Sequence, residues 1–361
     1  MNIRTKRRWK IIRNYMISWT LAFLFLAIIR GVGTIELGSI NFELKEALII
    51  SFTFGPFFGA ISGYVQNMTE KRYNQRVSVY RLIGFRLLYA VLFLFFLVFM
   101  AYIMVTQLFG EAQGFMAFAF EPGSIPIYFY ILTIDIFMLI LRQVNLMLGE
   151  NNLWKLLQGK FYTPREEDRI FMFLDLQSST EHAETLGHIL YSQLIQDCFN
   201  DLGVVVENEA EIYQYVGDEV ILTWELKKGL RHQNCLNAYF NFKHRINKRK
   251  THYQTKYNCL PFFKAGMHSG KITVTEVGKY KKEIAYHGDT INTTSRIQGQ
   301  CNALQQELLV SQQLKDQLNP IGFEFNDLGS IPLRGKEKEV VVYGVTQTSL
   351  NQKVPTLPSG L

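Results

Sequence analysis

Four long apolar stretches in the first 150 residues restrict this chain more than any other feature of its sequence. They cover residues 14–29, 47–69, 87–110 and about 125–148. The first three contain no charged residue, and the fourth contains only Asp135 and Arg142. A helix needs roughly 20 apolar residues to cross the hydrocarbon core of a bilayer. Residues 1–148 are therefore predicted to form an α-helical transmembrane domain of four spans in the lipid bilayer.

Two features of these spans carry further expectations. Asp135 lies in the middle of the fourth stretch, where a carboxylate facing lipid would be costly, so it is expected to face the bundle interior. A sensing or proton-transfer role and a structural hydrogen bond are both open for this residue. Gly55, Gly59 and Gly63 fall on one helix face, where they either admit the backbone of another helix or only relieve crowding.

The charges of the two halves differ and exclude one class of partner. Residues 1–150 hold 14 Lys and Arg against 8 Asp and Glu, whereas residues 151–361 hold 24 against 23. The net charge of +7 therefore belongs almost entirely to the apolar half, and the polar half offers no basic face to phosphates. No nucleic-acid partner is expected. The four cysteines form no C-x-x-C pair, so no zinc or redox site is predicted.

The loops between the spans predict the orientation. The tail before the first stretch carries six cations and no acid, and residues 70–86 carry five cations and one acid. The other two loops, about 31–45 and 107–124, hold one cation and four acids. Cytoplasmic loops are enriched in Lys and Arg. The chain is thus predicted to be a multi-pass protein of the cell (inner) membrane, with its N-terminus and its C-terminal half in the cytoplasm.

Residues 149–168 are predicted to connect the two halves as an amphipathic helix and a polar linker. Apolar and polar residues alternate here at helical spacing around Trp154. Such a helix would pair with its copy in a second subunit. A second interpretation makes it an interfacial anchor, with Trp154 at the lipid headgroups.

The remaining sequence predicts an α+β cytoplasmic domain over residues 169–346, followed by a C-terminal tail, 347–361. The pattern gives a buried strand at 169–176, a helix to about 200 that begins with a Ser178-x-x-Glu181 capping box, and a hairpin at 211–225 with Gly217-Asp218 at its turn. Further elements are expected as a helix at about 231–251, a strand–glycine turn–strand unit at 262–278, a strand at 281–289, a helix at 290–300, and strands near 308–310, 323–328 and 339–346. A β-α-β-β-α-β order predicts a ferredoxin-like, palm-type fold.

Two carboxylates carry the predicted chemistry of this domain. Asp175 ends the first strand and Asp218 lies at the tip of the hairpin, so the topology would bring them together. Carboxylate oxygens suit Mg²⁺, and the free N–H groups of a helix that starts at Ser178, Ser179 and Thr180 suit phosphate. A second interpretation makes Asp175 a helix cap and Asp218 a turn former.

Four segments together resemble one family. The segments FLDLQSST, YQYVGDEVIL, AGMHSGKI and HGDTINTTSRIQ occur in this order between residues 173 and 298. They resemble the catalytic domain of the class III nucleotidyl cyclases, and the whole plan resembles bacterial adenylate cyclases with a membrane domain ahead of one cyclase domain. The resemblance implies that Asp175 and Asp218 bind two Mg²⁺ (or Mn²⁺) ions per active site.

The resemblance also implies roles for residues outside the carboxylate pair. Asn292 and Arg296 match the asparagine and arginine that steady the ribose and the phosphates in the transition state. Arg334, with Lys336 as a substitute, matches a basic residue that contacts the phosphates. In the family, metal ligands come from one domain and the other residues from its partner, so a single cyclase domain implies a homodimer through the cyclase domain and the connector helix.

Base recognition is where this sequence departs from the family pattern. Gln214 and Ala285 occupy the two base-reading positions, where adenylate cyclases typically have lysine and aspartate or threonine. Glutamine can donate or accept, and alanine offers no hydrogen bond, so these residues do not select between adenine and guanine. The architecture favours ATP, with GTP as the alternative substrate. A rival function is a membrane receptor whose cyclase domain binds nucleotide without turnover.

Overall fold

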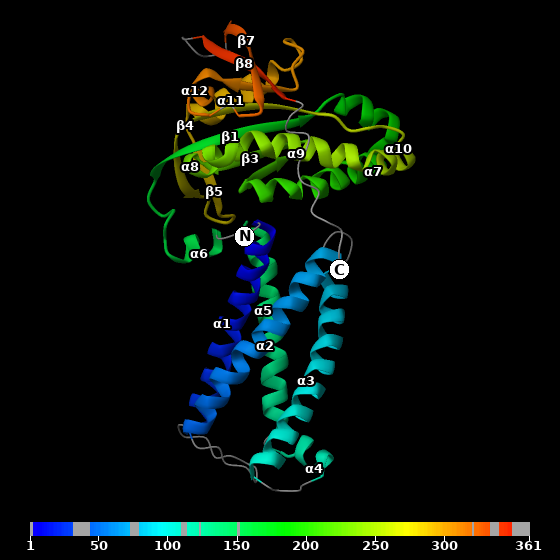
Figure 1. The fold of residues 1–361 in the computed structure, drawn as a ribbon, viewed down its shortest axis with the longest axis vertical. Helices are drawn as coiled ribbons and strands as arrows, with labels where there is room; N and C mark the ends of the chain where they lie inside the picture. The colour runs from blue at the N-terminus through cyan, green and yellow to red at the C-terminus, as the bar shows by residue number, and fades with distance from the viewer. Residues whose placement is uncertain are drawn as a thin grey trace. The chain divides into compact units, whose positions relative to one another are not determined.

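A computed structural model describes residues 3–31, 44–72, 79–109, 114–122, 124–149, 152–319, 321–332 and 339–348. The chain divides into two compact units, Met1–Met147 and Leu148–Leu361. Figure 1 draws both units with the element labels used below.

The first unit is entirely helical in its described part. Its helices are α1 (Ile3–Gly31), α2 (Leu44–Arg72), α3 (Val79–Phe109), α4 (Phe115–Ala119) and α5 (Ser124–Met147). Three segments, Thr5–Ile29, Ala47–Glu70 and Ser124–Met147, are long and apolar enough to cross a membrane. The described residues of α3 include a shorter apolar segment, Leu87–Met100. The described residues therefore contain three candidate spans, where the sequence predicts four.

Helices α1 and α2 pack backbone against backbone at the three glycines of α2. A Cβ atom added at Gly59 would lie 2.2 Å from Cα of Met16, and one at Gly55 would lie 2.6 Å from Cα of Thr20. Only glycine leaves room for so close a crossing. The glycine face thus serves helix packing within the chain.

Asp135 of α5 points into the helical unit, as the sequence predicts. It is only 3 % exposed, and Ile131 and Met138, one helical turn away on either side, belong to the buried cluster of this unit. A polar contact joins α5 to α2, where Arg142 donates to both carboxylate oxygens of Glu70 at 2.7 and 2.9 Å. Asp135, Glu70 and Arg142 thus lie among the helices of this unit.

The second unit is built on a mixed sheet. Its elements are α6 (Asn152–Leu157), β1 (Arg165–Leu176), α7 (Ser179–Leu202), η1 (Gly203–Asn208), β2 (Glu211–Val216), β3 (Glu219–Glu225), α8 (Leu226–Leu230), η2 (Arg231–Gln233), α9 (Asn234–Lys248), α10 (Lys250–Tyr257), β4 (Phe263–Val277), β5 (Glu283–His287), α11 (Asp289–Gly299), β6 (Leu308–Ser311), α12 (Gln312–Lys315), β7 (Phe323–Ile331) and β8 (Val340–Gln347). The strand order is β2-β3-β1-β4-β6-β8-β7, with β5 paired to β4 outside this path. β4 and β6 are parallel, and the other pairs are antiparallel. The β1-α7-β2-β3-α9-β4 portion confirms the predicted palm-type order.

The alternating side chains of β1 face two different clusters. Ile170, Met172 and Leu174 join the large core that includes buried residues of α7 and α9. Phe171 and Phe173 point to the opposite face, where they meet Phe161 and residues of β3, β4 and β5. We call this second surface the Phe171 face. A strand covered on both faces reads as a continuous apolar run, which is the pattern seen in the sequence.

Three local expectations were wrong. Residues 262–278 form one continuous strand, β4, because Ser269 and Gly270 pair with β1 rather than turn. Ser178 does not cap α7: its φ of 56° places it in the left-handed region, and its side chain makes no cap hydrogen bond, whereas a capping serine needs extended backbone. Among its described residues the connector is α-helical over Asn152–Leu157, and β1 begins at Arg165, earlier than the sequence predicts.

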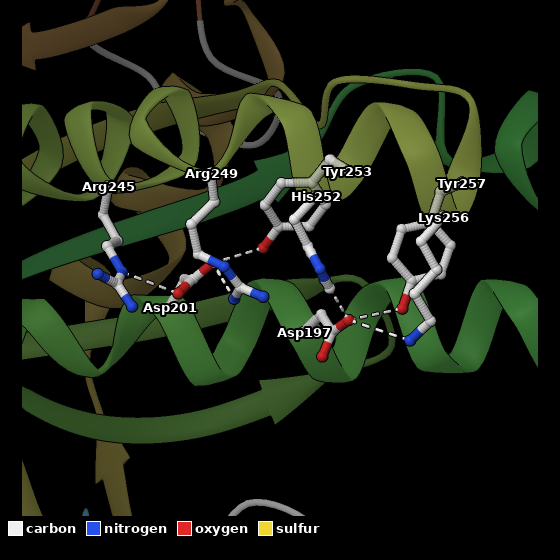
Figure 2. A network of polar contacts seen from close by, with 8 residues as sticks. All are labelled: Asp197, Asp201, Arg245, Arg249, His252, Tyr253, Lys256 and Tyr257. Carbon is white, nitrogen blue, oxygen red and sulfur yellow. Dashed lines mark hydrogen bonds and ion pairs between the residues drawn. The ribbon is translucent and has the colours of Figure 1, made fainter.

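A ladder of polar contacts ties α7 to α9 and α10 (Figure 2). Two aspartates one helical turn apart on α7, Asp197 and Asp201, are both almost fully buried. Each accepts three hydrogen bonds from the facing helices, with donor–acceptor distances of 2.7–3.2 Å. The donors are Arg245, Arg249 and Tyr253 for Asp201, and His252, Lys256 and Tyr257 for Asp197. The ladder fixes the C-terminal half of α7 to the helices beside it.

Candidate active site

Asp175 lies near the end of β1, where the chain is about to leave the sheet. Its sheet partners are Glu219 on β3 and Lys264 on β4. The residues on either side of it, Leu174 and Leu176, are fully buried, whereas Asp175 itself is half-buried. A rigid strand therefore presents this carboxylate at a partly open edge.

Asp218 occupies the two-residue turn of the β2–β3 hairpin, as predicted. Gly217 precedes it with φ of 63°, a conformation that glycine adopts without steric cost. The next residue, Glu219, lies directly opposite Asp175 in the ladder, and directly opposed residues share a face of the sheet. Three carboxylates therefore gather where β1 and the hairpin turn meet.

The gathered carboxylates repel one another. Burial, and then the charge of Asp218, raise the pKa of Asp175. Burial, followed by the charges of Asp175 and Asp218, raises the pKa of Glu219 to about 7. Carboxylates held this close favour either a proton or a cation between them. Glu219 is a member of this cluster that the motif comparison did not single out.

The cluster fits divalent cations that also bind phosphate. Among the described residues, no group of three or more His, Cys, Asp and Glu side chains is arranged to hold a metal ion. Mg²⁺ usually binds one or two carboxylates and completes its shell with water and substrate phosphates. Asp175 and Asp218 supply that kind of partial ligand set.

Three residues separate Asp175 from Ser179, where α7 starts. Ser178 and Thr180 are exposed, and Ser179, the first helical residue, is half-buried. The backbone leaves helical geometry again at Gly187, with φ of 70° and ψ of 165°, so α7 consists of two helical pieces. The first piece thus begins close to Asp175 along the chain, and the first N–H groups of a helix have no partner within the helix.

Helix α11 carries the predicted Asn292 and Arg296. Its buried residues, among them Thr293, Thr294 and Ile297, face its own sheet, whereas Asn292 is exposed and Arg296 is half-buried. The structure does not bring these two side chains into any described contact with Asp175 or Asp218. Both are available on the outer side of the helix.

One residue of α11 does contact the carboxylate cluster. The amide Nε2 of Gln298 donates to Oδ2 of Asp175 at 3.4 Å. The helix is held there by glycine, because a Cβ atom at Gly266 of β4 would lie 2.3 Å from the backbone nitrogen of Gln298. Sequence reasoning missed Gln298, and only its place two residues after Arg296 in the fourth motif hinted at it.

The two base-reading positions lie on strands that are not sheet neighbours. Gln214 on β2 is exposed, and Ala285 on β5 is half-buried. The residues beside them, Tyr213 and Tyr286, meet with ring centroids 4.6 Å apart. Arg334 and Lys336 lie outside the described residues.

Comparison with known proteins identifies relatives of this unit. Residues 161–347 match the family described as "Adenylate and Guanylate cyclase catalytic domain". Over 220 residues the chain is 31 % identical to Adenylate cyclase 2 of Rhizobium meliloti (strain 1021), covering 60 % of this chain and 61 % of that protein. It is also 32 % identical over 105 residues to a receptor-type guanylate cyclase of Caenorhabditis elegans, covering 29 % of this chain and 8 % of that protein. The chain thus matches about three fifths of the length of the Rhizobium protein.

Solved structures share the fold. A structure of a bacterial light-regulated adenylyl cyclase superposes with a TM-score of 0.53 at 15 % identity, covering 64 % of this chain and 68 % of that chain. A second structure of such a protein gives a TM-score of 0.51 at 17 % identity, covering 62 % and 66 %.

Proposed function

This chain belongs to the adenylate and guanylate cyclase catalytic domain family, as its four motifs predict, and from that membership we propose that it is a membrane-anchored adenylate cyclase. It converts ATP to 3′,5′-cyclic AMP and pyrophosphate, in intracellular signalling. The observation that carries the proposal is the gathering of Asp175 and Asp218 beside the first turn of α7.

Asp175 and Asp218 would hold two Mg²⁺ or Mn²⁺ ions. When bound, such ions neutralise the charge that develops on the attacking and leaving oxygens. Burial, and then the charge of Asp218, raise the pKa of Asp175, which supports this role because a carboxylate in such a place gains by taking up positive charge.

The remaining residues position the substrate. The N–H groups of Ser179 and Thr180 would donate to phosphate oxygens at the helix start, with Ser178 at its exposed edge. Arg334 and Lys336 contact the same phosphates. Asn292 and Arg296 steady the ribose and the α-phosphate while the 3′ oxygen bonds to the α-phosphorus and pyrophosphate leaves. In reactions of this kind, positioning and charge neutralisation supply most of the acceleration.

The active site is shared between two copies of the chain. Asn292 and Arg296 sit on the outer side of α11, which supports their use by a partner rather than by their own Asp175. Each chain carries both residue sets, so a homodimer through the cyclase domain and the connector helix would hold two sites.

The membrane unit anchors the enzyme. We propose four spans, with α3 as the fourth, in a multi-pass inner-membrane arrangement whose N-terminus and catalytic domain are cytoplasmic. The proposed boundaries are 1–148 for the membrane domain, 149–168 for the connector, 169–346 for the catalytic domain and 347–361 for the tail.

The experiment that tests this function measures cyclic-nucleotide formation by membranes that hold the full-length chain. ATP or GTP is supplied with Mn²⁺ or Mg²⁺, beside an Asp175→Ala control. Cyclic AMP that disappears in the control supports the proposal. Cyclic GMP as the main product would make the chain a guanylate cyclase, and nucleotide binding without product would favour the non-catalytic receptor.

A further inference from the structure

A buried arginine beneath the base-reading strands has no role in the reaction described above. Arg169 of β1 is 1 % exposed. Its Nε donates to Glu167 at 2.8 Å, and its Nη1 donates to Glu211 of β2 at 2.9 Å. Burying a guanidinium is costly unless its donors are paired, so these fixed carboxylate partners are needed to keep Arg169 buried.

The arginine also touches β5. Its guanidinium carbon lies 4.9 Å from the ring centroid of Tyr286, within the range of a cation–π contact. The same ring packs against Phe171 and Tyr213. The backbone N–H of Tyr286 donates to the phenolic oxygen of Tyr213 at 3.4 Å. Arg169 and the two tyrosines therefore join β1, β2 and β5.

The contacts among Arg169, Tyr213 and Tyr286 connect β5 with β2. In the sheet, β5 pairs with β4, and three strands separate it from β2 in the strand order. The sheet ladder alone therefore does not hold Ala285 near Gln214. Tyr286 follows Ala285 directly and Tyr213 precedes Gln214 directly, so the ring pair lies next to both predicted base-reading positions along the chain.

A β-bulge at Tyr213 adds to this effect. Ile212 pairs with Leu222, but Gln214 pairs with Ile221, so Tyr213 is an extra residue in β2. Ile221 lies on the Phe171 face, and directly opposed residues share a face. Tyr213 packs on the same face. The bulge thus puts Gln214 and Tyr213 on the face that also holds Tyr286.

We propose that Arg169, Tyr213 and Tyr286 are positioning residues for base recognition, which set the affinity for the purine by fixing β2 against β5. The proposal rests on the proposed function, because it assigns the base to Gln214 and Ala285. Gln214 and Ala285 have little selectivity of their own. In this proposal the spacing between β2 and β5, rather than a charged side chain, holds the purine ring.

The test compares Tyr286→Leu, which removes the ring, with Tyr286→Phe, which keeps the ring and its packing. Both are made in the full-length chain in membranes, and KM and kcat are measured for ATP and GTP at saturating Mn²⁺. Tyr286→Leu is expected to raise KM about tenfold while kcat changes less than about twofold, and Tyr286→Phe should stay close to wild type. Arg169→Lys, which keeps the charge but loses the planar fork, should raise KM by a smaller factor.

A purely structural role would give a different result. Partial unfolding removes active enzyme and lowers the apparent kcat, but it leaves the KM of the remaining enzyme unchanged. Unchanged KM in Tyr286→Leu would therefore overturn the proposal. If that variant yields too little folded protein, Tyr213→Leu, at a half-buried position, tests the same spacing.

Binding of a fluorescent ATP analogue separates this inference from the proposed function. A wild-type chain that binds the analogue without turnover would overturn the proposed activity alone, and a weaker affinity in Tyr286→Leu would still support the positioning role. Wild-type turnover with unaltered affinity in Tyr286→Leu would overturn the positioning role alone. A wild-type chain that neither binds nor converts nucleotide would overturn both.

Discussion

The contact between Gly266 and α11 offers a direct way to disturb the active site without touching it. A Cβ atom at Gly266 would lie 2.3 Å from the backbone nitrogen of Gln298 and 2.6 Å from its Cα. Ordinary contact begins at 3.4 Å, so Gly266→Ala makes the helix and the strand move apart by about 1.1 Å. Both obstructing atoms belong to the backbone, so no side-chain rotation relieves the clash.

The displaced helix carries Asn292 and Arg296 and the amide that contacts Asp175. A misplacement of 1 Å costs about 100-fold in rate when reacting groups must be aligned, so kcat is expected to fall by about two orders of magnitude. Overpacking of a tight contact typically costs about 1–3 kcal/mol of stability. Most molecules of the variant should therefore remain folded while losing activity.

Gly299→Ala is the matched control, because it makes the same glycine-to-alanine change on α11 itself. Its Cβ atom would meet nothing within 4 Å. Cyclic-nucleotide formation and thermal unfolding are measured for both variants beside wild type. A Gly266→Ala enzyme whose kcat stays within about threefold of wild type would refute the idea that this contact aligns the site.

Four further outcomes are expected. Co-expressed Asp175→Ala and Arg296→Ala chains, each inactive alone, should recover about one quarter of wild-type activity, because half of randomly paired dimers are mixed and one of their two sites is intact; no recovery would contradict the shared site. Gln214→Lys should raise the ATP/GTP preference roughly tenfold, since lysine only donates and adenine N1 only accepts; an unchanged ratio would mean that Gln214 does not read the base. Asp201→Ala should lower the free energy of unfolding by about 2–3 kcal/mol, as measured by chemical denaturation. The loss is smaller than for a fully buried ion pair because Arg245 and Arg249 reach water. Burial opposes ionisation of Asp197, but hydrogen bonds from Tyr257, His252 and Lys256 outweigh it and lower its pKa. The stabilisation that ionised Asp197 gives the fold is therefore complete above about pH 4 and is lost as the pH falls further. Thermal unfolding of wild type and Asp197→Asn over that range should show a smaller pH dependence in the variant.

Local signals in the sequence were enough to place the two aspartates. An apolar run ending in Asp175 predicts a buried strand, and Gly217-Asp218 between two such runs predicts a hairpin turn. Both features depend on residues a few positions apart. The resulting order of strands and helices then brings the carboxylates together without further information.

Contacts between distant segments were not predictable in the same way. Gln298 and Arg169 reach Asp175 and Tyr286 only after the sheet has formed, and no spacing rule links those positions. Gly270 shows the opposite difficulty, because a glycine inside a strand pattern suggests a turn. In the structure, Gly270 lets α11 pack closely against β4, because a Cβ atom there would lie 2.6 Å from Oγ1 of Thr290 on α11. Glycine occurs both at turns and at close packing contacts, and only the tertiary structure distinguishes the two cases.

The bulge in β2 has a consequence for transferring substrate preference between relatives. A bulge adds one residue to one strand and leaves the partner strand unchanged. In a relative without this bulge, the residue that follows the counterpart of Ile212 pairs where Gln214 pairs here, opposite Ile221. Matching positions by counting from the start of the strand would therefore place a grafted purine-reading residue one position off, on the other face of the sheet. Exchanges of specificity should therefore move the whole hairpin, 211–225, rather than single positions matched by number.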